Sequence, residues 1–232
     1  YVYGKDVLDV GCGTGLHALG YVVAGVNSYT GLDPKINLVS DIGKNLRNRQ
    51  WEHFGWTPLD IMRKVPHVRF ISGTFETIAP EVTFDIVVLH NVTEHLHNLE
   101  DVFKGIVKRL RPDGRILYNH HNFFCWNGHH KMPKSLTDID LENPTQRKYI
   151  DWGHIAFAES HTDELSEKLN KIRMDDLRGL TEKSFLIESW KEIPSNAEQG
   201  QIRFTNEIIH KYPKYEKREF MIQNIFCVAQ VK

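Results

Sequence analysis

The chain has 232 residues, of which 41% are hydrophobic and 25% are charged, which is the composition of a globular protein with one well-buried core. No apolar run reaches the length of a membrane span and no signal peptide is visible, so the default expectation is a cytoplasmic protein. The formal net charge of −1 argues against a dedicated nucleic-acid-binding surface, and the three cysteines, Cys12, Cys125 and Cys227, do not form a paired disulfide framework.

The first element is an apolar strand, Asp6 to Val10, which runs directly into glycines at Gly11, Gly13 and Gly15. Glycine lets the backbone turn sharply and lets a ligand approach where a Cβ would block it. A helix expected over 16–23 then begins on the turn, and its N-terminus completes a pocket for a nucleotide-like ligand. The third glycine comes one residue too early for the Gly-x-Gly-x-x-Gly fingerprint, which disfavours a nicotinamide oxidoreductase.

With Asp9 near the end of the strand, the turn reads Asp-x-Gly-x-Gly-x-Gly, which resembles the first motif of the class I S-adenosylmethionine (SAM) methyltransferases. The resemblance implies a Rossmann-like, doubly wound α/β fold with a mostly parallel seven-stranded sheet and an antiparallel last strand. It also implies SAM as the cofactor. SAM carries a sulfonium and an ammonium, so a carboxylate such as Asp9 suits the site electrostatically. A glycine turn that serves packing alone is the alternative interpretation.

A second strand is expected from Ser28 to Asp33, with an acid at its tip. In a Rossmann-like fold this is where the ribose hydroxyls are bound, and one carboxylate can accept hydrogen bonds from both of them. We therefore predict that Asp33 binds the ribose, the alternative being an ordinary turn residue before Pro34. The following segment, 35–66, is helical in character, with its aromatic residues expected in the core.

A third strand is expected from His67 to Ser72, and Thr74, Phe75 and Glu76 follow it. In the family that this chain resembles, this stretch lies against the adenine, so these three residues are predicted to bind the cofactor. Family members often have Asp where this chain has Thr74. The adenine contact is therefore open between Glu76 and the backbone near Phe75.

The clearest strand runs from Thr83 to His90, and its nearly continuous apolar sequence predicts burial on both faces. His90 and Asn91, at its end, are predicted to lie beside the cofactor. An amphipathic helix over 99–110 and a turn at 111–114 lead to a fifth strand from Arg115, again as in the methyltransferase family.

Residues 119–180 interrupt this alternation of strands and helices. They are expected to form a helical and loop insert on the acceptor side, including a helix from Thr162 to Leu177. Strands at 184–190 and 222–231 then close the sheet as an antiparallel pair. We expect a single domain over 1–232. The chain starts at Tyr1, only a few residues before the first strand, where the family usually carries helical sequence, so we expect a fragment of a longer polypeptide.

The acceptor should bind where the fourth and fifth strands end, because ligands of open α/β sheets lie beyond the carboxyl ends of the strands. One of His95, His120 or His121 is predicted to be the general base for a hydroxyl acceptor. Alternatively, Glu94, His95 and His121 hold a divalent cation that lowers the pKa of the acceptor. Some class I O-methyltransferases carry Glu-x-x-Glu-His here, whereas this chain has Asn91 in place of the first acid.

The predicted reaction is SAM-dependent O-methylation of a small molecule or a sugar. Trp126, Trp152 and His154 could form a sugar-binding surface or equally the core of the insert. An N-methyltransferase or a nucleic-acid methyltransferase is the alternative, although the motif that grips a flipped base does not follow the fourth strand. A binding module without turnover also remains open, and the oligomeric state is not predicted.

Overall fold

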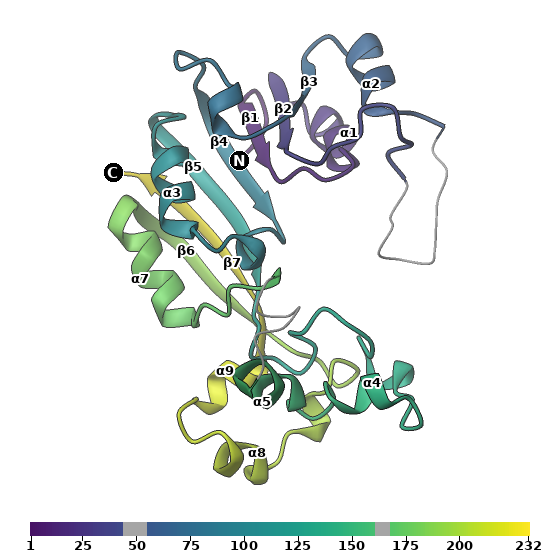
Figure 1. Cartoon of the computed structure of the whole chain (residues 1–232). Helices are drawn as coiled ribbons and strands as arrows, with labels where there is room; N and C mark the ends of the chain where they lie inside the picture. The colour runs from purple at the N-terminus through teal and green to yellow at the C-terminus, as the bar shows by residue number, and fades with distance from the viewer. Residues whose placement is uncertain (44–54, 161–167) are drawn as a thin grey trace.

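The computed structural model describes residues 1–43, 55–160 and 168–232. Its centre is a seven-stranded sheet of order β3-β2-β1-β4-β5-β7-β6 (Figure 1). The strands are β1 Asp6–Val10, β2 Ser28–Asp33, β3 Val68–Ser72, β4 Phe84–His90, β5 Leu110–His121, β6 Phe185–Pro194 and β7 Ile222–Val231. β7 is antiparallel to both of its neighbours and the remaining pairs are parallel. The expected Rossmann-like fold is therefore confirmed.

Helices cover both faces of the sheet. Those that pack on the sheet are α1 His17–Val23 and α2 Pro58–Lys64 on one face and α3 Leu99–Val107 and α7 Met174–Ser184 on the other. The other described α-helices, α4 Pro144–Arg147, α5 Gly153–Ser160, α8 Asn206–Lys211 and α9 Lys217–Met221, lie beyond the end of the sheet (Figure 1). Because side chains alternate along a strand, Val7 packs into the core shared with α1 and α2, whereas Leu8 packs into the core shared with α3 and α7. Both faces are buried, which explains the nearly uninterrupted apolar sequence of β4.

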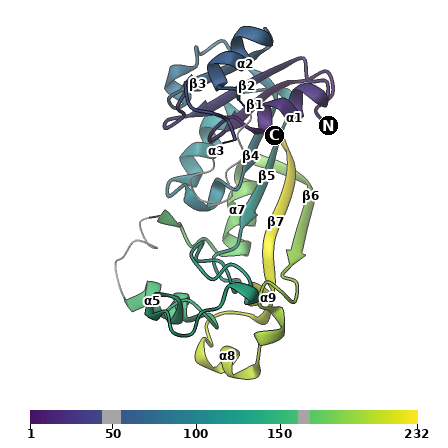
Figure 2. The ribbon, with the colours of Figure 1, turned by 90° about the vertical axis from the view of Figure 1, so that its right-hand side faces the viewer.

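A separate group of helices and loops, which we call the lobe, lies beyond the carboxyl end of β5 (Figures 1 and 2). Its apolar core draws on residues 123–169 and also on the β6–β7 connection, 195–221. Trp152 is the centre of this packing: its Nε1 donates to the Phe124 carbonyl at 3.0 Å, and its own carbonyl accepts from the Tyr212 hydroxyl at 2.8 Å. The expected insert of 119–180 is thus incomplete, because a second segment supplies part of its core.

Three local expectations are wrong in part. Of the segment 35–66, residues 35–43 are turns and loops, and the described helix there is α2, which begins at a capping box between Thr57 and Asp60. Residues 161–167 lie outside the described part, 169–173 are not helical, and α7 begins at Met174. The expected turn at 111–114 is instead an irregular start of β5, with Asp113 at φ 63° and a register shift against β4.

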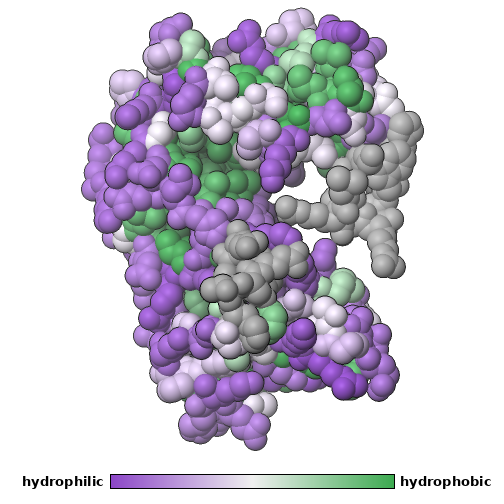
Figure 3. Space-filling model, viewed as in Figure 1, coloured by the Kyte–Doolittle hydropathy of each residue, from purple (hydrophilic) through white to green (hydrophobic). Residues whose placement is uncertain are grey.

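The carboxyl ends of β1 and β4 point toward the lobe (Figure 1). On this side of the molecule the surface is notched between the half that carries β1–β3 and the lobe (Figure 3). In the order of strands, β1 and β4 are the neighbours at which the winding of the sheet reverses, which is where open α/β sheets bind ligands. None of the described helices is both long and apolar enough to cross a lipid bilayer.

Candidate active site

The glycine turn after β1 holds three residues in the left-handed region, with φ of 74° at Gly11, 60° at Gly13 and 83° at Gly15. A Cβ on Gly11 would lie 2.6 Å from Val92, and one on Gly15 would lie 2.6 Å from the ring of Phe70. A Cβ on Gly13 would meet nothing within 4 Å. Two of the glycines are therefore required for packing, while Gly13 presents bare backbone to the space above the turn.

Asp33, at the end of β2, has a carboxylate that the backbone fixes beside this turn. Its Oδ2 accepts from the amide of Gly13 at 3.0 Å and its Oδ1 accepts from the amide of Lys35 at 2.7 Å. A carboxylate has about four acceptor positions, so two hydroxyl groups can still donate to it. The geometry fits the predicted role in binding a ribose.

Asp9 lies beneath the turn and is fully buried. Its Oδ2 accepts from the Tyr29 hydroxyl at 2.7 Å, whereas its Oδ1 has no hydrogen-bond partner among the described residues. Burial raises the pKa of Asp9 to about 6, and the hydrogen bond from Tyr29 opposes that rise. A buried carboxylate oxygen of this kind is stabilised by a cation, so the residues fit a ligand that carries an ammonium or a sulfonium.

The stretch after β3 carries Thr74, Phe75 and Glu76, which were predicted to bind the cofactor. The Thr74 hydroxyl donates to the carboxylate of Glu76, and this bond lowers the pKa of Glu76. Both side chains are exposed. The ring of Phe75, however, packs against Gly105 of α3, and its carbonyl accepts from Arg109 at 3.0 Å. The ring of Phe75 is therefore engaged by the protein, and the predicted contact with an adenine falls to its main chain or to Glu76.

His90 and Asn91 behave differently although they are adjacent. The His90 side chain turns toward α1, where its Nε2 lies 2.7 Å from the Tyr21 hydroxyl and its ring lies 4.8 Å from that of His17. Asn91 adopts φ 51°, and its side-chain Oδ1 accepts from the side-chain Nδ2 of Asn119 at 2.6 Å. His17 and Tyr21 were not predicted, but their spacing of four residues places both on one face of the helix that opens over the turn.

The three histidines predicted as bases are not equivalent. His120 is 1% exposed, its Nδ1 lies 2.9 Å from the Thr93 hydroxyl, and burial lowers its pKa to about 3. An acceptor cannot reach it, so the structure argues against His120 as the base. His121 and His95 are only partly buried. The alternation of side chains along β5 explains the difference between His120 and His121, because adjacent residues of a strand face opposite sides of the sheet.

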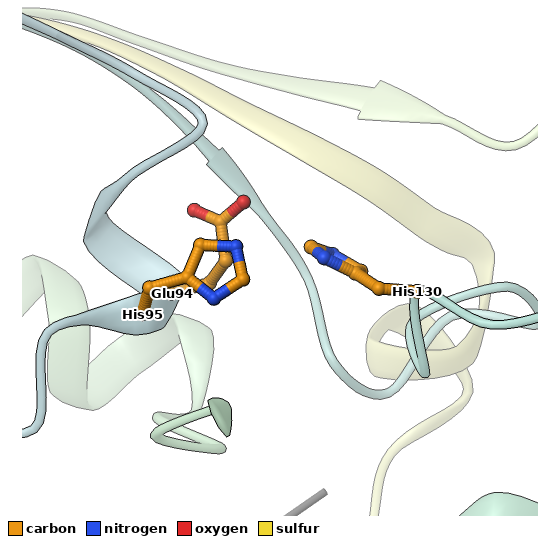
Figure 4. A group of neighbouring side chains, drawn as sticks. All are labelled: Glu94, His95 and His130. Atoms are coloured by element: carbon orange, nitrogen blue, oxygen red, sulfur yellow. The ribbon is translucent and has the colours of Figure 1, made fainter. Parts of the chain in front are cut away.

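Glu94, His95 and His130 face one another (Figure 4). One ligand atom from each lies within 4.8 Å of the others. Glu94 and His95 come from the short 3₁₀ helix η2, Thr93–His95, directly after β4, and His130 comes from the lobe. The metal set predicted from the sequence contained His121, but its place in the described cluster is taken by His130, whose ring lies 4.6 Å from that of His121.

The comparisons with known proteins agree on the class of protein. A family model described as a methyltransferase domain matches residues 2–182. A ubiquinone biosynthesis O-methyltransferase of Rickettsia bellii is 28% identical over 109 residues, which is 47% of this chain and 39% of that protein. The chain thus matches about two fifths of the length of this curated relative.

Two solved structures show the same fold. An S-adenosylmethionine-dependent methyltransferase from Mesorhizobium loti has a TM-score of 0.54 at 16% identity, covering 99% of this chain and 92% of that chain. A 1,6-didemethyltoxoflavin-N1-methyltransferase of Burkholderia thailandensis, solved with S-adenosylhomocysteine, has a TM-score of 0.56 at 15% identity, covering 99% and 72%. With its glycine turn, its strand order and the family match over most of its length, the chain belongs to the class I methyltransferases that use SAM as the methyl donor.

Proposed function

We propose that the protein transfers the methyl group of SAM to a hydroxyl oxygen of a small molecule that binds at the carboxyl ends of β4 and β5. The observation that carries this proposal is the gathering of His95, His121 and His130 at these strand ends. Imidazoles are the usual groups for accepting a proton from a hydroxyl at neutral pH. The name of the Rickettsia relative, an O-methyltransferase, supports the same chemistry.

On the donor side, the chain's own residues bind and orient. Asp33 is placed to accept from the two ribose hydroxyls, Asp9 favours a positive charge above the turn, and Gly13 leaves the approach open. Bound SAM supplies a methyl group that its sulfonium already activates. The protein therefore contributes mainly by holding the acceptor oxygen in line with that methyl group.

On the acceptor side, we assign the general base to His121. Burial lowers its pKa to about 4, so its imidazole is neutral at pH 7 and can accept a proton. A base this weak suits an acidic hydroxyl, such as a phenol or an enol, better than the alcohol of a sugar. Trp126, Trp152 and His154 are at most 1% exposed, so they do not present the aromatic surface on which the expectation of a sugar depended.

The test uses SAM with an isotopically labelled methyl group and two acceptors of matched shape, protocatechuate and the corresponding diaminobenzoate. We expect an O-methyl product from the first acceptor, identified by NMR. Methylation of the diamine alone would instead indicate an N-methyltransferase.

The variant His121→Ala should lower kcat and leave the Kd for SAM unchanged. His67→Ala, an exposed histidine next to the start of β3, is the matched control. If His121→Ala were fully active on the acceptor that the unmodified protein methylates, the assignment of the base would be refuted.

A further inference from the structure

We propose that Glu94, His95 and His130 bind a divalent transition-metal ion, such as Zn²⁺, on the acceptor side of the site. The role of the ion in activating the acceptor hydroxyl depends on the proposed function, whereas metal binding itself depends only on the geometry of these three residues.

The first support is the spacing and the chemistry of the ligand atoms. They lie within 4.8 Å of one another, and tetrahedral ligands around Zn²⁺ lie about 3.4 Å apart, so small side-chain rotations would close the site. Two imidazole nitrogens and one carboxylate oxygen suit Zn²⁺, Co²⁺ or Fe²⁺ better than Mg²⁺, which prefers oxygen alone. Three protein ligands leave one position for a hydroxyl oxygen, as in catalytic zinc sites.

The second support is the surroundings of the cluster. Glu94 is 2% exposed, and its carboxylate oxygens and the Nε2 atoms of His95 and His130 are shielded from solvent. In a low dielectric, a carboxylate attracts a cation more strongly than it does in water.

The third support is the hydrogen bond that orients His95. Its Nδ1 lies 2.8 Å from the carbonyl oxygen of Lys168. A carbonyl can only accept, so Nδ1 carries the proton and Nε2 keeps the lone pair that a metal requires. A bond from the second ring nitrogen to a carbonyl is the usual arrangement of metal-binding histidines.

Asn170 fixes the turn that carries Glu94 and His95. Its side-chain amide donates to the carbonyls of Thr93 at 2.7 Å and Leu96 at 2.9 Å, and its backbone amide donates to the carbonyl of Glu94 at 2.8 Å. Three hydrogen bonds from one residue thus hold η2 against the segment that follows the lobe.

A tight loop places His130 opposite this turn. A Cβ on Gly128 would lie 2.0 Å from the carbonyl oxygen of Phe123, so only glycine fits there. His130 itself adopts φ 57°, a conformation that costs a non-glycine residue about 1 kcal/mol and persists where the surroundings impose it.

In the reaction, the ion would bind the acceptor oxygen and lower the pKa of its hydroxyl. The hydroxyl proton passes to His121, and an electron pair of the oxygen forms the new O–C bond to the methyl carbon. The electron pair of the broken S–C bond stays on sulfur, which gives S-adenosylhomocysteine.

The test is titration of chelator-treated protein with Co²⁺, a spectroscopic probe for Zn²⁺ sites. We expect one Co²⁺ per chain, with visible absorption that Zn²⁺ abolishes. His130→Ala should weaken Co²⁺ binding at least about a hundredfold, and Asn170→Ala about tenfold to a hundredfold, as for residues that orient metal ligands. His121→Ala and His67→Ala are the controls and should bind Co²⁺ as the unmodified protein does.

An unchanged Kd for SAM will show that His130→Ala is folded. Stoichiometric Co²⁺ binding that persists in His130→Ala, or no Co²⁺ binding by the unmodified protein, would overturn the inference. If O-methylation of protocatechuate survives chelator treatment unchanged, the ion has no role in the reaction and the proposed function stands without it. Co²⁺ binding without any O-methylation would leave the metal site standing and refute the proposed function.

Discussion

Replacing Asp33 by alanine should weaken SAM binding by about a hundredfold to ten-thousandfold. The carboxylate is held by the amides of Gly13 and Lys35 at 3.0 and 2.7 Å, so it is already oriented before the ribose binds. A hydrogen bond to a charged group contributes about 1.5–3 kcal/mol, so two ribose hydroxyls account for about 3–6 kcal/mol. Each 1.4 kcal/mol is a tenfold change in Kd, which gives the stated range. Asp33→Asn keeps one acceptor oxygen and should lose about half of this free energy.

The assay is calorimetric titration of SAM into the unmodified protein and both variants, with thermal melting to confirm that each is folded. Asp140→Ala is the matched control, since the Asp140 carboxylate likewise accepts from a backbone amide two residues along, at 3.0 Å, but lies in the lobe. If Asp33→Ala bound SAM within about threefold of the unmodified protein, the assignment of the ribose site would be refuted, since two lost hydrogen bonds predict far more.

Three further predictions follow from single contacts. Since Asp9 has a pKa of about 6 and is protonated below that pH, the affinity for SAM should fall as the pH drops through 6, and Asp9→Asn should remove this dependence in a titration series. Gly15→Ala should lower the free energy of unfolding by about 2–4 kcal/mol in urea, because its Cβ would meet Phe70 and φ is 83°; Gly20→Ala, with open space around it, should not. Trp152→Ala should cost about 3–5 kcal/mol by the same method, and a loss below 1 kcal/mol would contradict its place in the core of the lobe.

The sheet and the donor side of the site could be predicted because their signals are local in the sequence. The observed bounds of β1 and β7 are those expected, since a run of apolar residues ending in a turn identifies a strand without knowledge of its neighbours. The position of Asp33 beside the glycine turn could be predicted in the same way, because the acid ends a strand and this placement is a property of the fold.

The acceptor side could not be predicted to the same depth, because its geometry depends on contacts between distant segments. The lobe needs the β6–β7 connection as well as the insert, and nothing in the sequence around Phe220 indicates that it packs against Trp152. The sequence favoured His121 as a metal ligand for its place at a strand end. His130 lies opposite Glu94 because of a loop that Gly128 allows, and this follows from backbone contact rather than from spacing.

The central claim is that the methyl donor binds over the glycine turn and faces the histidines at the ends of β4 and β5. A crystal structure of the protein with S-adenosylhomocysteine tests it most directly. We predict that both ribose hydroxyls lie within hydrogen-bond distance of the Asp33 carboxylate and that the sulfur faces the side of His95 and His121. A ribose bound by other residues, or a sulfur turned away from these imidazoles, would contradict the account.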